Sequence, residues 1–148
     1  MRTSHFPMFV DLRGKPCVIV GGGAIARRRA EVLTRFGGAV TVIAPAWLGG
    51  VPGVRWERRA YASGDLAGAF LAVAATGDRR VNLRVGEEAR ALGIPVSVAD
   101  RREECSFFFP AVCQGGGVTA GLVSQGGGDH ARTARAARAV RRTLEGLD

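Results

Sequence analysis

Residues that build metal centres and disulfide frameworks are scarce in this sequence. Among its 148 residues there are three cysteines, with no C-x-x-C pair, and two histidines near opposite ends of the chain. The odd cysteine count and this spacing argue against a disulfide framework and against a zinc ribbon. We therefore expect no preassembled transition-metal site, which leaves only a transient metal contact open.

Long hydrophobic runs are also absent. The longest apolar stretch covers residues 69–75, far short of the roughly 20 residues of a membrane span. The N-terminal MRTSHFPMFV lacks the positive region and the apolar core of a secretory signal. The length and the 47% of hydrophobic residues suit one compact domain with a short appendage. We expect a cytoplasmic protein with no membrane partner.

Lysine is nearly absent, although the chain is strongly basic. The formal net charge is +8, from 21 basic and 13 acidic residues, and Lys15 is the only lysine. Arginine pairs bidentately with carboxylate and phosphate, so the charge suits nucleic acid, an anionic lipid surface or a polycarboxylate metabolite. The alternative is a GC-rich genome that encodes arginine in place of lysine, and composition alone favours this alternative.

Short apolar runs alternate with helical periodicity over the first hundred residues. Strands are predicted at residues 17–20, 39–44, 54–56, 69–75 and 95–99, and helices at 24–36 and 78–92. The first helix would bury Ile25, Val32, Leu33 and Phe36, and the second Val81, Val85, Ala89 and Leu92. This alternation predicts an α/β fold with a Rossmann-like, doubly wound parallel sheet.

The sharpest feature is a glycine turn between the first predicted strand and the first predicted helix. Gly21, Gly23 and Ala26 match the pattern G-x-G-x-x-G/A in its strand–turn–helix context. The first glycine permits the turn, the second lets the backbone approach a pyrophosphate, and the small alanine allows close packing. The helix N-terminus offers unpaired N–H groups to the phosphates. We expect a dinucleotide site here, and the alternative is a turn that only connects two elements.

The acidic residue that usually follows the second strand of NAD-binding folds is missing. The chain has Ile43-Ala44-Pro45-Ala46 at this place. The adenosine ribose must therefore be held in another way, for which backbone groups are the candidates. Arg27, Arg28 and Arg29 could pair with the 2′-phosphate of NADP, but we expect their helix turns to point away from the end of the second strand.

A carboxylate follows the last predicted strand of the sheet. Ligands of open α/β sheets bind beyond the carboxyl ends of the strands, and Asp100 falls there. A carboxylate in this place can take a proton from a substrate, and the neighbouring Arg101 and Arg102 would favour its ionised form. Position alone equally allows a surface aspartate or a turn-forming one.

The character of the sequence changes after Asp100. Two strands are predicted at residues 106–112 and 118–124, and a helix at 130–144. Five arginines would lie on one side of this helix, opposite a packing side of small and apolar residues: Arg132, Arg135, Arg138, Arg141 and Arg142 against Thr133, Ala136, Ala137, Val140 and Leu144. A solvated basic face is the ordinary interpretation, and a polyanion-binding face is the alternative.

Four ordered motifs together resemble precorrin-2 dehydrogenases, the NAD-dependent enzymes of siroheme synthesis that occur alone or as the N-terminal module of siroheme synthase. The motifs are residues 6–23 with Ala26, Arg28 and Arg29; residues 74–78 with Val81 and Asn82; residues 98–100 with Cys105, Ser106, Phe107, Pro110 and Ala111; and residues 124–127. This combination is far more specific than the glycine motif alone.

The resemblance implies oxidation of precorrin-2, a tetrapyrrole polycarboxylate, to sirohydrochlorin, and some members of the family also insert ferrous iron. Asp100 would be the catalytic residue. NAD would contact Gly21, Gly22, Gly23, Ala24, Ile25, Pro45, Ala46, Ala75 and Thr76. We expect an NAD-binding Rossmann domain over residues 1–113 and a dimerisation segment over residues 114–148, and hence a homodimer.

A second hypothesis is a non-catalytic nucleotide-binding module whose arginine-rich helix binds nucleic acid or a protein partner. No aromatic residues interleave with the arginines, which disfavours nucleic acid as a partner. Asp100 with its S-F-x-x-P context discriminates between the hypotheses, because a binding module does not need it. We therefore expect an enzyme.

Overall fold

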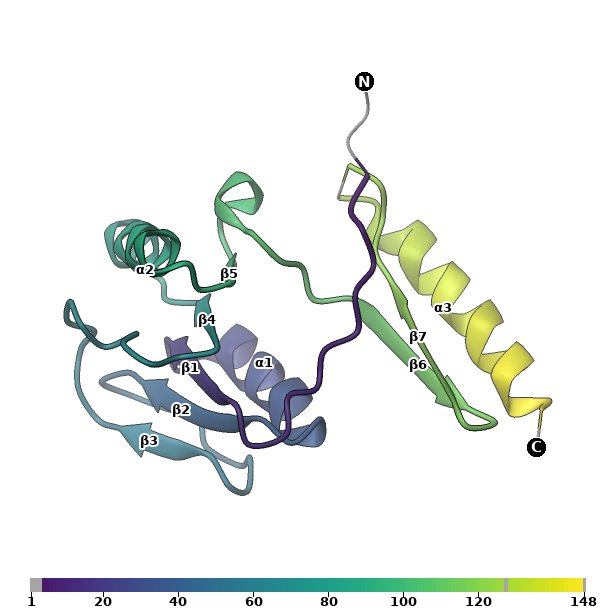
Figure 1. The fold of residues 1–148 in the computed structure, drawn as a ribbon, viewed down its shortest axis with the longest axis horizontal. Helices are drawn as coiled ribbons and strands as arrows, with labels where there is room; N and C mark the ends of the chain where they lie inside the picture. Colours follow the sequence, from purple (N-terminus) through teal and green to yellow (C-terminus); the bar gives the residue numbers. More distant parts are fainter. Residues whose placement is uncertain (1–3, 127, 148) are drawn as a thin grey trace. The chain divides into compact units, whose positions relative to one another are not determined.

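The computed structural model describes residues 4–126 and 128–147. The chain forms two compact units, one made by residues 10–107 and the other by the described parts of residues 1–9 and 108–148 (Figure 1). The expected boundary at residue 113 would cut through a strand, whereas the two units divide between Phe107 and Phe108.

The larger unit contains a five-stranded parallel sheet. Its strands are β1 (Pro16–Val20), β2 (Ala39–Ile43), β3 (Arg55–Glu57), β4 (Leu71–Ala74) and β5 (Val96–Val98). They lie in the order β3-β2-β1-β4-β5, so the winding direction reverses between β1 and β4. Val20 pairs with Ile43 on one side and with Ala74 on the other, which brings three carboxyl ends level at one edge. The predicted doubly wound fold is confirmed, and its switch point lies at this edge.

Two helices cover the sheet, α1 (Ala24–Arg35) and α2 (Arg79–Leu92). The side chain of Asp78 caps α2 by accepting a hydrogen bond of 2.9 Å from the backbone of Arg80. Gly93 ends α2 in the left-handed conformation with φ of 70°, which glycine adopts without steric cost. Both boundaries therefore follow from local residue chemistry.

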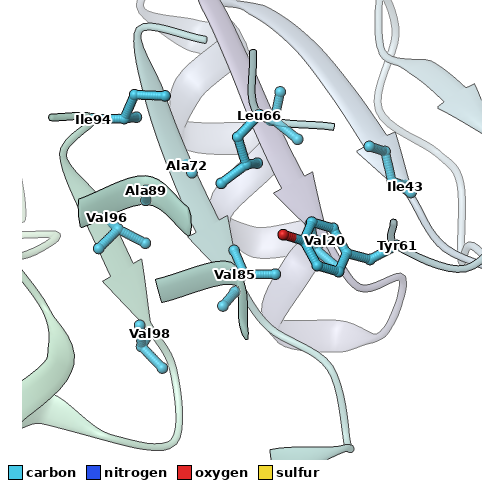
Figure 2. Close-up of a cluster of buried hydrophobic side chains, with 12 residues drawn as sticks. Val20, Ile43, Tyr61, Leu66, Ala72, Val85, Ala89, Ile94, Val96 and Val98 are labelled. Atoms are coloured by element: carbon cyan, nitrogen blue, oxygen red, sulfur yellow. The ribbon is translucent and has the colours of Figure 1, made fainter. Parts of the chain in front are cut away.

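The core on the α2 side contains the alternate residues of the strands (Figure 2). Val18 and Val20 of β1 belong to it, whereas Cys17 and Ile19 do not, because successive strand residues point to opposite faces. Tyr61, from the segment after β3, also lies in this core and is 8% exposed.

The predicted buried faces of the two helices are only partly right. Helix α1 buries Ala26, Ala30 and Leu33, while Ile25 is 46% exposed. Helix α2 buries Val85 and Ala89 as expected, but its last residue, Leu92, is 53% exposed. The small alanines of α1 allow the close approach of helix and sheet that a larger side chain would prevent.

The smaller unit is a hairpin with a helix packed on it. Antiparallel strands β6 (Ala111–Gly115) and β7 (Val118–Leu122) precede α3 (His130–Glu145). The predicted strand at residues 106–112 is wrong over its first part. Ser106 instead lies beside β5, where its N–H donates to the Val96 carbonyl at 2.8 Å and its hydroxyl accepts from the Val96 N–H at 2.8 Å.

Helix α3 packs on the hairpin through a narrow stripe. Ala137 and Leu144 are buried against Cys113, with Val140 partly buried beside them. Ala136, which the periodicity placed on the packing face, is exposed. In the described part of the chain, no helix has the length and apolar character to cross a membrane.

Candidate functional site

A cleft of about 640 Å³ lies at the carboxyl edge of the sheet, within the range of small-molecule sites. Its walls come from the ends of β1, β2 and β4, the segment after β3 and the beginning of α2. Most of the residues expected at a cofactor site line it: Gly21, Gly22, Gly23, Pro45, Ala46, Ala75 and Thr76. The switch point of the fold therefore coincides with a physical cavity.

Two glycines of the turn are required by the protein's own backbone. Gly21 has φ of 123°, and a Cβ there would collide with the carbonyl of Ala75. A Cβ on Gly22 would collide with the carbonyl of Ala46. Glycine at both positions thus allows the backbone after β2 and the backbone after β4 to approach the turn closely.

Gly23 differs from its two neighbours. It lines the cleft, and a Cβ built on it would meet no protein atom within 4 Å. Its backbone φ of −88° is open to any residue. The bare backbone at Gly23 therefore leaves space that a ligand can use, at the start of α1, where the helix dipole favours a negative charge.

Two of the expected cofactor residues do not line this cleft. Ala24 lines a smaller cleft of about 280 Å³ between α1 and the loop after β2, together with Arg27 and Leu48. Ile25 is exposed and lines neither of the two clefts. Both residues lie on the first turn of α1, whose side chains turn away from the sheet edge.

Arg27 of α1 lies beside the loop that follows β2. A Cβ on Gly50, in the loop after β2, would come within 2.9 Å of the Arg27 Nη2 atom. The Nε atom of Arg27 lies 3.4 Å from the Glu31 carboxylate, so this guanidinium is held between its own helix and the loop.

The loop after β2 is tied to the glycine turn. The backbone N–H of Leu48 donates to the carbonyl of Gly22 at 3.0 Å, and the indole of Trp56 donates to the carbonyl of Ala44 at 2.9 Å. Asp78 supplies the one carboxylate among the lining residues, and its side chain caps α2. Backbone groups thus dominate the polar surface of this wall.

Several lining residues were missed by the sequence reasoning. Trp47 and Leu48 directly follow the expected Pro45 and Ala46, so proximity in sequence could have indicated them. Tyr61 carries no such signal, since it reaches the cleft from a segment without regular structure. Burial, with a hydrogen bond to Glu88 second, raises the pKa of the Tyr61 phenol, which keeps it neutral at physiological pH.

Asp100 lies in the turn after β5, at the same sheet edge, but it does not line the cleft. Its carboxylate accepts a hydrogen bond of 2.8 Å from Arg79 Nη1. Arg79 Nη2 donates to Glu104 at 2.5 Å, so one guanidinium spans two carboxylates. Arg79, the first residue of α2, is therefore an ion-pair partner of Asp100 that the sequence analysis did not identify.

Metal-ligating side chains do not gather anywhere in residues 4–126 and 128–147: no three His, Cys, Asp or Glu residues there could hold an ion together. Gly127, part of the fourth motif, lies outside the described residues.

Comparisons with known proteins agree with this arrangement. Residues 8–111 match the model of a family described as "Putative NAD(P)-binding". The chain is 40% identical over 150 residues to the "Probable multifunctional siroheme biosynthesis protein HemA" of Ruminiclostridium josui. It is also 40% identical over 139 residues to the siroheme synthase of Ectopseudomonas mendocina. These alignments cover 97% and 90% of this chain.

The chain spans 29% of the length of each of these two relatives. Among solved structures, it is similar to one titled "SirC, precorrin-2 dehydrogenase", with a TM-score of 0.76 and 26% sequence identity. That similarity covers 94% of this chain and 71% of the other. Both units of the present chain therefore have counterparts in a single known fold.

Proposed function

Because the chain belongs to the NAD(P)-binding family that its residues 8–111 match, we propose that it is an NAD-dependent dehydrogenase that oxidises precorrin-2 to sirohydrochlorin. The resemblance to siroheme-synthesis enzymes that the four motifs predicted is confirmed by the named relatives. The observation that carries the proposal is the cleft itself, which collects the motif residues at the switch point of the sheet.

The residues of the cleft fit a dinucleotide. The open backbone at Gly23 and the N-terminus of α1 would receive the pyrophosphate, as in other folds of this kind. Ala75 and Thr76, after β4, would line the nicotinamide half, and Pro45 and Ala46, after β2, the adenosine half. NAD, when bound, supplies the acceptor for a hydride.

Asp100 is the proposed base. Oxidation of precorrin-2 to sirohydrochlorin removes a hydride and a proton, and a carboxylate at this edge can accept the proton. Arg79 would keep the carboxylate in place through its hydrogen bond of 2.8 Å. Because Asp100 is outside the cleft wall, its carboxylate would meet the substrate above the cleft rather than the bound dinucleotide.

The positive charge of the chain suits this substrate. Precorrin-2 is a polycarboxylate, and arginine pairs with carboxylates bidentately. The net charge of +8 would raise the local concentration of such an anion and speed its encounter with the protein.

One experiment tests the proposal directly. Purified chain is incubated without oxygen with precorrin-2 and NAD, and the absorption spectrum of sirohydrochlorin is followed together with that of NADH. We expect equal amounts of both products. Binding of NADH without any conversion of precorrin-2 would instead favour the non-catalytic module, whose basic helix would then be tested with nucleic acid.

We also propose that the protein is a homodimer assembled through the hairpin unit. The residues Ala111, Cys113, Ala120 and Leu122 face α3, so the alternate residues of the hairpin form a second face that α3 leaves uncovered. A two-stranded hairpin is only marginally stable by itself, and its edges invite pairing. A second copy of the chain would cover both the face and an edge.

Our proposal for location is the cytoplasm. All three cysteines, Cys17, Cys105 and Cys113, are free thiols, which is typical of reducing compartments. Burial raises the pKa of Cys17 to about 11, so this thiol stays protonated and unreactive. Immunodetection in cell fractions would test the location.

A further inference from the structure

Asn82 is a fully buried polar residue. The hydrogen bonds of its side-chain amide all join it to one residue, Thr76. It lies in the first turns of α2 and is 0% exposed. Its Oδ1 atom accepts from the Thr76 N–H at 3.0 Å and from the Thr76 hydroxyl at 2.7 Å. Its Nδ2 atom donates to the Thr76 carbonyl at 3.0 Å. Every polar group of Thr76 is therefore engaged by the same side chain.

Thr76 occupies a critical place in the cleft wall. It lies in the irregular segment between β4 and α2, and this segment lines the cleft from Ala75 to Asp78. At the start of this segment, the Ala75 N–H donates to the Val20 carbonyl of β1 at 2.8 Å, whereas Thr76 lies beyond the last paired residue of β4. The Thr76 hydroxyl also bonds locally to Asp78: it accepts from the Asp78 N–H at 3.1 Å and lies 3.0 Å from the Asp78 carbonyl, an alternative acceptor for its proton. Asn82 is the residue within α2 whose side chain bonds Thr76 directly.

Only an amide side chain can make this set of contacts. An acceptor is needed for the N–H and the hydroxyl of Thr76, and a donor is needed for its carbonyl. Aspartate lacks the donor, and an apolar residue lacks both. Thr76 is itself only partly buried, so without Asn82 its freed N–H and carbonyl groups would turn toward water or other partners, and the segment would move.

We propose that Asn82 is a positioning residue for the dinucleotide. It does not line the cleft and does not touch the ligand, but it holds Thr76 and its neighbours in the conformation that receives the nicotinamide half. This inference rests on the proposed function, because it takes the cleft to be the dinucleotide site.

The test is a titration of NADH into wild-type protein and the Asn82→Ala variant, followed by nicotinamide fluorescence, with thermal unfolding measured in parallel. The matched control is Val85→Ala, on the next turn of α2, which is 0% exposed and belongs to the core rather than the cleft. Both substitutions should lower thermal stability. Only Asn82→Ala should weaken NADH binding, by about ten-fold or more, the scale of one lost buried hydrogen-bonding partner.

A second measurement separates positioning from general destabilisation. Hydrogen exchange of the peptide that covers residues 74–78 should be faster in Asn82→Ala than in Val85→Ala. Each variant is measured at the same temperature interval below its own unfolding midpoint. Should Asn82→Ala fail to fold, Asn82→Asp, which keeps the shape of the side chain and removes the Nδ2 donor to the Thr76 carbonyl, should still weaken NADH binding.

The outcomes distinguish this inference from the function on which it rests. If wild-type protein does not bind NADH, the proposed function fails. If wild-type protein binds NADH and Asn82→Ala binds it as well as Val85→Ala does, Asn82 is a structural residue only. An unchanged affinity in a folded Asn82→Asp variant would overturn the inference in the same way.

Discussion

At the scale of single residues, three adjacent glycines have different reasons to be glycine. Gly21 and Gly22 are required by collisions with backbone carbonyls of Ala75 and Ala46. Gly23 faces open space, so the folded protein itself places no demand on it. Under the proposed function, the demand for glycine at position 23 comes from the pyrophosphate, so substitution there should separate binding from folding.

Gly23→Glu should abolish NADH binding while the protein keeps its fold. The new side chain would occupy the space at the start of α1 and bring a negative charge to the phosphate site. Calorimetric titration measures the affinity, and thermal unfolding checks the fold. Gly23→Ala is the graded control, with a smaller loss of affinity. Unchanged affinity in the glutamate variant would move the pyrophosphate away from this turn.

Asp100→Ala should lower the rate of precorrin-2 oxidation by about 100-fold or more, the scale for losing a positioned acid or base. NADH affinity should stay within a few-fold of wild type, because Asp100 does not line the cleft. The measurement is the rate of sirohydrochlorin formation under saturating NAD.

Glu103→Ala provides the control for Asp100, since it removes an exposed carboxylate from the neighbouring 3-10 turn (Arg102–Glu104). This variant should react at the wild-type rate. If Asp100→Ala also reacts at that rate, Asp100 has a structural role through Arg79, and the catalytic assignment has to be given up.

At the scale of elements, the segment between β3 and β4 is held by two carboxylates. Asp65 accepts from Arg59 at 2.8 Å and from the Ala62 N–H at 2.7 Å. Glu88 of α2 accepts from the N–H groups of Gly64 and Leu66. These bonds replace strand pairing in a segment that carries Tyr61 into the core and the cleft.

Asp65→Asn should destabilise the protein in a pH-dependent manner. The hydrogen bond from Arg59 lowers the pKa of Asp65 below its ordinary value. A lowered pKa in the folded state stabilises the fold above the unfolded pKa of about 3.9, and this contribution is lost as the pH falls through the folded pKa. Urea unfolding should therefore show a deficit in the variant at pH 7 that vanishes in acid. A deficit that is constant with pH would contradict this account.

At the scale of the whole molecule, the smaller unit exposes several large apolar side chains. Its hairpin is covered by α3 on one face, and exposed apolar residues remain: Val118 is 45% and Val123 is 44% exposed. In the N-terminal segment of the same unit, Phe6 is 86% and Phe9 is 72% exposed. A second copy of the chain, as proposed, would remove apolar side chains of this kind from water.

Light scattering should give twice the chain mass of 15.5 kDa at micromolar concentration. Thr119→Glu places a charge on the exposed face of β7 and should shift the protein to monomer. The control Arg138→Glu changes the charge on the exposed side of α3 and should leave the dimer intact. A monomeric wild-type protein would contradict the proposed assembly.

Much of the fold was predictable because its signals are local. The glycine turn, the Asp78 cap and the Gly93 stop act within a few residues of the boundaries they set. Buried parallel strands have apolar runs that are visible in sequence. The switch point of such a sheet lies at the carboxyl ends of its strands, and it brought most of the expected cofactor residues to one cleft.

By itself, then, the sequence determined the doubly wound fold, its family resemblance and the sheet edge at which we propose that the dinucleotide binds. Tertiary structure alone decided which side chains reach that edge. The spacing of apolar residues cannot distinguish a helix from the same helix rotated about its axis by one residue. We therefore expected Ile25 to face the core, whereas the alanines of α1 pack against it. Arg79 pairs with Asp100, and Asn82 makes hydrogen bonds with Thr76. Both interactions join separate segments, so they exist only after α2 has packed on the sheet.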